Sequence, residues 1–299
     1  LAISESQERM AVVLAAEDTE KFINAAREEN LEATVVARVT DTNRLRMKWR
    51  GRYIVDISRD FLDSSGVGQR TEVFVASPSE EDNYFRKKAE EPAGRKSLKD
   101  RWISSLQNLN ACSQKGLAER FDSTIGAGTV LLPYGGKYEL TPAEGMAAKI
   151  PVLNGEANTA TVMSYGFNPE ISEWSPFHGA VYAILEAVAK ITAMGGDYST
   201  IRLSLQEYFE RLGKDPKKWG KPFAALLGAL YVQEKLGIPA IGGKDSMSGS
   251  FNDIHVPPTL VAFAVALTDA GCILSPEFKS TDSFAVLIHL DKDENDLPD

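Results

Sequence analysis

Residues 238–249 read Ile-Pro-Ala-Ile-Gly-Gly-Lys-Asp-Ser-Met-Ser-Gly, an apolar run that ends abruptly in two glycines and a polar cluster. Glycine lets the backbone approach a ligand closely, and successive exposed N–H groups can bind an anion. The four-residue spacer of a Walker loop is absent. The stretch fits a phosphate-binding loop at the end of a strand, and it also fits a tight turn between two buried strands. Its candidate binding residues are Gly242, Gly243, Lys244, Asp245 and Ser246.

Two apolar helices precede this stretch. Apolar residues recur at helical spacing over 179–194, where Gly195-Gly196 ends the pattern, and again over 223–236, where Gly237 ends it. Because these helices mix with strands without a regular βαβ rhythm, the pattern predicts an α+β fold. The predicted strands of this part are Thr129–Pro133, Thr159–Tyr165, Ile238–Ile241, Leu260–Leu267 and Phe284–Leu290.

The N-terminal part of the chain predicts a separate small unit with helices at Thr19–Asn30 and Arg59–Asp63. Alternating apolar residues predict its strands at Met10–Ala15, Ala33–Val39, Arg44–Lys48 and Arg52–Ile57. Charged and small polar residues then dominate between Ser77 and Lys99, which is typical of a linker or of a loop that extends over the surface. Helices are predicted again at Trp102–Asn110 and Lys115–Phe121.

The composition narrows the classes of function. A chain of 299 residues is long enough for two domains, and a net charge of −9 argues against a nucleic-acid partner. The two cysteines, Cys112 and Cys272, form neither a disulfide framework nor a zinc pattern, so a reducing cytoplasm fits best. We see no secretory signal and no apolar run near ~18 residues, and we therefore expect no contact with a membrane.

Two further polar groups are candidates. Glu5, Ser6 and Gln7 stand in a polar run just before an apolar stretch, where they form either a solvated lead-in or a hydrogen-bonding clamp for a substrate. Glu186 stands four residues before Lys190 on the first apolar helix, which favours an i,i+4 ion pair over a metal carboxylate. The three histidines share no sequence neighbourhood, and no nucleophile, base and acid can be grouped.

Four motifs in order give the chain a resemblance. They are Glu5-Ser6-Gln7-Glu8-Arg9-Met10, Asp122-Ser123-Thr124 with Gly126–Val130, Thr141–Lys149 and Gly242–Ser248. Together they resemble phosphoribosylformylglycinamidine synthase in its long, single-chain form. The resemblance implies an ATP-dependent ligase of purine biosynthesis that uses Mg²⁺ and glutamine-derived ammonia to convert formylglycinamide ribonucleotide to the amidine.

The same resemblance implies a domain arrangement. The family consists of two halves of the aminoimidazole ribonucleotide synthetase type, each with an N-terminal α+β domain and a C-terminal domain. Residues 1–80 then match the end of the first C-terminal-type domain, and residues 81–100 form a linker. Residues 101–268 match the second N-terminal-type domain, and residues 269–299 begin its C-terminal-type domain. We therefore expect an internal fragment.

The resemblance also assigns roles to residues. Glu5, Ser6 and Gln7 would orient the substrate, and the residues from Gly242 to Ser246 would hold nucleotide phosphates. Lys244 replaces an asparagine that binds Mg²⁺ in small-form relatives, and an ammonium cannot ligate a cation. The family's second, structural nucleotide site holds Mg²⁺ through positions nearest to Asn154, Glu186 and Lys190, of which Lys190 opposes a cation.

The family's catalytic histidine and its glutaminase domain have no counterpart here. We therefore expect no catalytic residue in this fragment and no activity of the fragment alone. A non-catalytic scaffold or interface segment of the same enzyme is one alternative, and another ATP-using relative, such as a thiamine monophosphate kinase, is a second. Because N-terminal domains of the family pair through their sheets, the fragment is also a candidate homodimer.

Overall fold

The computed structural model describes residues 9–64, 70–87, 97–109, 111–121 and 123–298. The chain divides into two units, Leu1–Arg70 and Thr71–Asp299. The domain boundaries expected at residues 80, 100 and 268 stay predictions.

The first unit is a small αββα segment without a core. Its described elements are η1 (Ala16–Asp18), α1 (Thr19–Glu28), β1 (Arg44–Trp49), β2 (Arg52–Ser58) and α2 (Arg59–Ser64). Strands β1 and β2 form an antiparallel hairpin whose two turn residues, Arg50 and Gly51, have φ values of 49° and 79°. Positive φ at both positions matches the right-handed twist of a hairpin. No residue of this unit is buried within the described ranges.

Three predicted strands are wrong. Residues 10–15, 33–39 and 284–290 are extended or irregular and join no sheet in the described structure. Their alternating apolar residues fit a strand, but a strand also needs a neighbouring strand to satisfy its backbone N–H and C=O groups. The other predicted helices and strands of the chain are confirmed, most of them with shifted ends.

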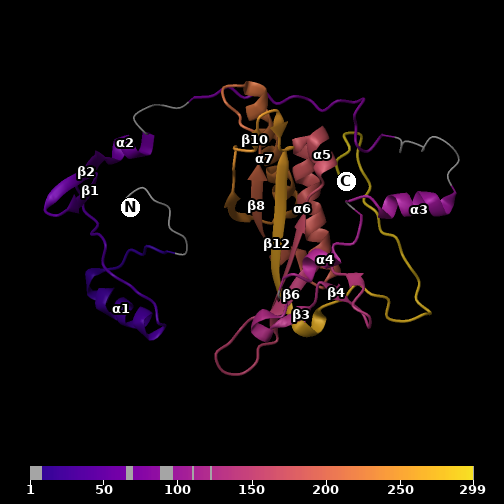
Figure 1. The fold of residues 1–299 in the computed structure, drawn as a ribbon, viewed down its shortest axis with the longest axis horizontal. Coiled ribbons are helices and arrows are strands. Elements are labelled where there is room, and N and C mark those ends of the chain that lie inside the picture. Colours follow the sequence, from indigo (N-terminus) through magenta and orange to yellow (C-terminus); the bar gives the residue numbers. More distant parts are fainter. Residues whose placement is uncertain (1–8, 65–69, 88–96, 110, 122, 299) are drawn as a thin grey trace. The chain divides into compact units, whose positions relative to one another are not determined.

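The second unit is built on a six-stranded mixed sheet in the order β3-β6-β7-β12-β8-β9. All neighbouring strands run antiparallel except β8 and β9, which are parallel. Figure 1 shows β12, the longest strand, running through the middle of this sheet. The strands are β3 (Thr129–Leu131), β6 (Gly145–Lys149), β7 (Thr159–Gly166), β8 (Arg202–Tyr208), β9 (Ala240–Lys244) and β12 (Thr259–Asp269). The expected α+β fold is confirmed.

Helices cover one face of this sheet. Helix α6 (Pro176–Ala193) packs against β7 and β12, and α7 (Pro216–Leu236) packs against α6 (Figure 1). The remaining described elements are short: α3 (Leu98–Leu106), α4 (Lys115–Ala118), η2 (Ile125–Ala127), β4 (Tyr134–Gly135), β5 (Thr141–Pro142), α5 (Pro169–Trp174), η3 (Tyr198–Thr200), β10 (Ser250–Phe251), β11 (Ile254–His255) and η4 (Ala270–Cys272). In the described residues, no helix has both the length and the apolar character needed to cross a membrane.

Small residues let α6 lie close to the sheet. Every second residue of β7 from Ala160 to Gly166 and of β12 from Leu260 to Ala266 is buried beneath the helices, among them Ala262 and Ala264. A Cβ on Gly166, at the end of β7, would lie 2.0 Å from the Ala183 carbonyl oxygen of α6. Only glycine therefore fits at this contact.

Candidate nucleotide site

The crossover β8–α7–β9 positions the glycine stretch. Asp215 caps α7 by accepting a hydrogen bond from the Lys217 amide, and Pro216 occupies the first helical position. Gly237 ends the helix in the left-handed conformation, with φ 66°. The chain then enters β9, which pairs in parallel with β8 and forms one edge of the six-stranded sheet. The helix therefore supplies the long connection that a parallel pair requires.

The two glycines lie inside β9 and do not form a tight turn, which corrects both the expected loop and the expected strand end at Ile241. Gly242 has φ 148°, a conformation that other residues rarely adopt. A Cβ on Gly243 would lie 1.9 Å from the Leu205 carbonyl oxygen of β8. Backbone conformation explains the first glycine, and close contact between the two strands explains the second.

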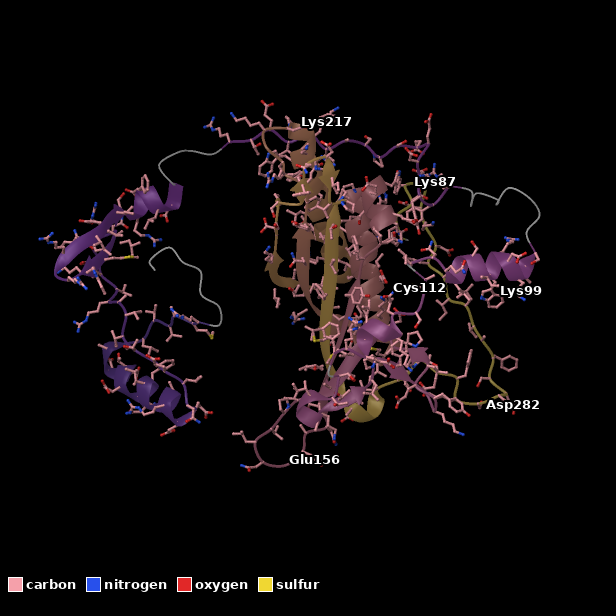
Figure 2. All side chains as sticks on the ribbon, in the orientation of Figure 1. Lys87, Lys99, Cys112, Glu156, Lys217 and Asp282 are labelled. Atoms are coloured by element: carbon pink, nitrogen blue, oxygen red, sulfur yellow. The ribbon has the colours of Figure 1, made fainter. Side chains whose placement is uncertain are left out.

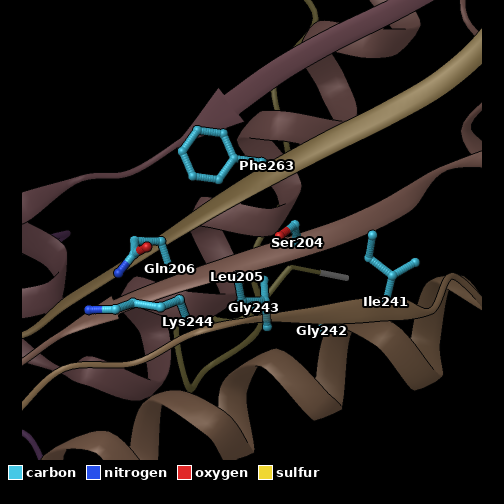
Figure 3. A pocket seen from close by; sticks show the side chains of 8 residues that line it. All are labelled: Ser204, Leu205, Gln206, Ile241, Gly242, Gly243, Lys244 and Phe263. Carbon is cyan, nitrogen blue, oxygen red and sulfur yellow. The ribbon is translucent and has the colours of Figure 1, made fainter. Parts of the chain in front are cut away.

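An open depression of about 360 Å³ lies over the ends of these strands. Figure 3 shows Gln206 of β8 and Lys244 of β9 extending side by side, with the Phe263 ring of β12 above them. Gln206 and Lys244 are register partners in the parallel pair. The lining consists of Ser204, Leu205, Gln206, Ile241, Gly242, Gly243, Lys244 and Phe263.

Lys244 is the charged residue of this lining. Across the described residues, its ammonium has no hydrogen bond or ion pair, and it is exposed. As an edge strand, β9 also leaves backbone groups without a partner strand on one side. A free ammonium beside unpaired amides and the side-chain amide of Gln206 can bind an anionic group such as a phosphate.

The next two predicted residues serve the loop more than the depression. The Ser246 amide donates to the Glu207 carbonyl at 3.1 Å, and the Phe209 amide donates to the Ser246 carbonyl at 2.9 Å. The Ser246 and Ser248 hydroxyls are 2.9 Å apart. Asp245 is exposed. The structure thus brings Gly242, Gly243 and Lys244 to the depression and leaves Asp245 and Ser246 just beyond its lining.

Sequence reasoning missed Glu207, a buried carboxyl on β8 next to this loop. Its side chain is 5% exposed, and its Oε1 has no hydrogen-bond partner among the described atoms. Burial, with a smaller contribution from the negative charge of Asp245, raises the pKa of Glu207 to about 7. The alternation of Leu203, Leu205 and Glu207 on one face of a strand is the signal that could have found it.

The two residues proposed for a metal lie apart. Asn154 is exposed in the loop between β6 and β7, the loop in which Figure 2 labels Glu156. Glu186 accepts a hydrogen bond from the Phe167 amide, just beyond the other end of β7. Strand β7 lies between these positions along the chain, and its seven steps of about 3.3 Å span about 23 Å. The predicted i,i+4 pair of Glu186 with Lys190 is confirmed, at 2.7 Å.

The chemistry of the donors does not favour a resident metal. Within the described ranges, no three His, Cys, Asp or Glu side chains lie close enough together to hold a metal ion. His178 is buried and bonded to the Ser175 hydroxyl and the Asn295 carbonyl, and both cysteines are free thiols. Glu5, Ser6 and Gln7 lie outside the described residues.

Comparison with known proteins gives one match to a family model, namely "AIR synthase related protein, C-terminal domain", over residues 1–50. The PurL subunit of phosphoribosylformylglycinamidine synthase from Thermoplasma acidophilum is 25% identical over an alignment of 284 residues, and the match covers 89% of this chain and 34% of that subunit. The PurL subunit from Mycobacteroides abscessus is 26% identical over an alignment of 270 residues, and the match covers 89% of this chain and 33% of that subunit. The chain thus spans about a third of the curated relatives it matches.

Solved structures extend the match to the fold. Thermotoga maritima PurL in complex with ATP has a TM-score of 0.64 at 20% identity, and the match covers 92% of this chain and 40% of that one. The same protein in complex with FGAR has a TM-score of 0.58 at 17% identity, covering 89% and 37%. Over most of its length, the chain is therefore similar in sequence to the PurL subunit of phosphoribosylformylglycinamidine synthase, and it shares its fold with Thermotoga maritima PurL.

Proposed function

We propose that the chain is part of an ATP-dependent carbon–nitrogen ligase of purine biosynthesis. The whole enzyme would convert formylglycinamide ribonucleotide, glutamine and ATP to formylglycinamidine ribonucleotide, glutamate, ADP and phosphate. The names of the curated relatives support this proposal, as do the ATP and FGAR complexes of the Thermotoga relative. Origin from the long, single-chain form and a location in the cytoplasm belong to the same proposal.

The free ammonium of Lys244 at the edge of the sheet carries the part of this function that the chain performs. ATP would place its phosphates against Lys244 and the unpaired amides of β9, with Gly242 and Gly243 allowing the close approach. Phosphoryl transfer depends mainly on positioning and on neutralising charge, and an ammonium supplies both. Asp245 and Ser246 would hold the loop that presents these groups.

Titration with ATP tests this role. The 299-residue chain is compared with Lys244→Ala and with Lys214→Ala, a control that removes an exposed lysine from the loop before α7. A hydrogen bond to a charged group contributes about 1.5–3 kcal/mol, so we expect Lys244→Ala to weaken ATP binding at least ~10-fold. The control should keep its affinity. Equal affinity of all three proteins would remove Lys244 from the site.

The formylglycinamide substrate would be oriented by Glu5, Ser6 and Gln7, whose side chains offer hydrogen-bond donors and acceptors. Gln7→Ala should weaken binding of that substrate and leave ATP affinity unchanged. Unchanged substrate affinity would contradict the clamp.

Other parts of the enzyme would supply the ammonia and the catalytic residues. Neither cysteine of this chain stands in a nucleophile pattern, so glutamine hydrolysis would take place elsewhere. Mg²⁺ would arrive with the nucleotide phosphates, since the described residues offer no set of three acidic, histidine or cysteine ligands for it. We therefore assign no catalytic residue to this chain.

A scaffold or interface role is the second candidate, and the uncovered face of the sheet favours it. Met163, Tyr165 and Phe263 are 40%, 56% and 41% exposed there, although they lie on central strands. A second copy of this chain could bury them and form a homodimer. Analytical ultracentrifugation decides: a strict monomer at high concentration would contradict self-association, and this outcome leaves the ATP proposal untouched.

A further inference from the structure

Lys190, near the end of α6, lies among three oxygen atoms from three parts of the second unit. Its Nζ is 2.7 Å from Glu186 Oε1, 3.1 Å from Glu144 Oε2 and 3.1 Å from the Tyr165 carbonyl oxygen. The same ammonium lies 4.8 Å from the centre of the Tyr165 ring. Glu144 precedes β6, Tyr165 belongs to β7 and Glu186 to α6, so one cation joins two strands to the helix.

The surrounding structure fixes the oxygen atoms in place. The second oxygen of Glu186 accepts a hydrogen bond from the Phe167 amide at 3.0 Å, which orients the carboxylate. A Cβ on Gly166 would lie 2.9 Å from the Cβ of Glu186, so the glycine allows the helix to bring that carboxylate against the strand. The Tyr165 carbonyl belongs to the ladder of β7 and has little freedom to move.

The position is sheltered as well as charged. A cavity of about 350 Å³ adjoins it, and apolar side chains including Leu131, Met194 and Leu274 line that cavity. Only 14% of the Lys190 side chain is exposed. Burial alone would lower the pKa of Lys190, but hydrogen bonds to Glu186 and Glu144 outweigh it and raise the pKa above its usual value. The ammonium therefore stays charged.

Two carboxylates and a backbone carbonyl are the oxygen ligands that hard divalent cations prefer. We propose that the Lys190 ammonium is a built-in cation, which fills the position between Glu144, Glu186 and the Tyr165 carbonyl and makes a bound metal ion unnecessary there. This differs from the metal site that the family resemblance implied at this part of the fold. Replacing the lysine should therefore open a latent site for a divalent cation.

Binding of Mn²⁺ alone, followed by electron paramagnetic resonance, tests the proposal. The variant Lys190→Asn removes the charge and offers an amide oxygen from the same helix position. Lys214→Asn makes the same exchange on an exposed loop and serves as the control. We expect Lys190→Asn to gain one bound Mn²⁺ per chain, held at least ~10-fold more tightly than by the wild type or the control. Adding Glu186→Gln should abolish the gain.

Two results would overturn the proposal. One is a wild-type chain that already binds a Mn²⁺ ion which Glu186→Gln removes. The other is a folded Lys190→Asn variant that binds no more Mn²⁺ than the wild type. If circular dichroism shows that Lys190→Asn does not fold, Lys190→Ala is melted in methylammonium chloride and in equal sodium chloride. A higher melting temperature in methylammonium supports the built-in cation, and equal temperatures contradict it.

Discussion

The two faces of the six-stranded sheet carry alternate residues of the same strands, but one face forms the core and the other is exposed. On the covered face, Val162 and Ala264 have no more than 1% of their surface exposed beneath α6. On the open face, Met163 and Phe263, their direct neighbours in sequence, are 40% and 41% exposed. Because strand side chains alternate between faces, one segment of sequence supplies both the core and an uncovered surface. The open face can bind a partner or ligand only because the covered face already holds the fold.

Charge separates the faces as well. The covered side buries two glutamates at the end of β8 and just beyond it. Glu210 is paired with Lys218 at 2.7 Å and Lys221 at 2.5 Å, whereas Glu207 has an oxygen without a partner among the described atoms. On the open side, the ammonium of Lys244 has no hydrogen bond or ion pair with any described residue. The carboxyl oxygen of Glu207 and the ammonium of Lys244, both without a partner among the described residues, thus lie near the ends of β8 and β9 but on opposite faces of the sheet.

The largest effect on stability should come from a mutation that creates a cavity in the core beneath the covered face. Ile184 of α6 is fully buried, so Ile184→Ala should lower the free energy of unfolding by about 2–5 kcal/mol. Met163→Ala, the matched change on the open face, should lower it by less than about 1 kcal/mol because that side chain is partly solvated already. Urea unfolding followed by circular dichroism measures both. Similar losses for the two variants would mean that the open face is also a core.

The next effect concerns the contact between β8 and β9. Gly243→Ala would place a Cβ against the Leu205 carbonyl, forcing the strands apart and costing about 1–3 kcal/mol. ATP affinity should fall with it, since the depression loses its shape. Gly116→Ala in α4 is the control, because nothing lies within 4 Å of its Cβ and its backbone is helical. Equal melting temperatures of Gly243→Ala and the wild type would show that β9 is not held by this contact.

Periodicity was enough to predict the elements that form the covered face. The apolar spacing of α6 and the glycines that follow it predicted a helix over 179–194, and the structure has it over Pro176–Ala193. Gly237 was predicted to end the second helix, and it does, with φ 66°. These signals are local, since a helix satisfies its own backbone hydrogen bonds.

Strands and the site were harder to predict because they depend on distant neighbours. Residues 33–39 alternate as well as β1 does, yet they pair with no strand in the described ranges. The sequence of the two glycines in β9 is compatible with a turn and with a strand. The close contact between Gly243 and the Leu205 carbonyl of β8, which shows that they form a strand, is visible only in the fold. The charge cluster around Lys190 also required the fold, because sequence spacing identified Glu186 but not Glu144.

A smaller effect on stability should follow from the titration of Glu207, the buried carboxyl on the covered side. The pKa of Glu207 in the folded chain is about 7, against about 4.5 for an exposed glutamate, so the folded state binds this proton more tightly. The stability of the wild type should therefore fall as the pH rises from about 4.5 to 7 and stay level above that. Glu207→Gln removes the titration and should be more stable than the wild type by about 1–2 kcal/mol at pH 8.

The control for this prediction is the same pair of proteins at pH 4.5, where the wild-type carboxyl is protonated and the advantage of glutamine should vanish. Urea unfolding across the pH range measures the difference. A constant difference at all pH values would mean that the glutamine acts through packing and that Glu207 does not titrate near neutrality.

The smallest effect belongs to the open face. Phe263→Thr keeps a residue suited to a strand and removes a ring that is 41% exposed, so the stability of the monomer should fall by no more than about 1 kcal/mol. If two copies bury this face against each other, the same change should shift sedimentation toward the monomer at high protein concentration. Unfolding is therefore measured at low concentration, where only the monomer contributes. A large loss of stability there would show that the ring packs within its own chain, and the contrast between the two faces would then fail at β12.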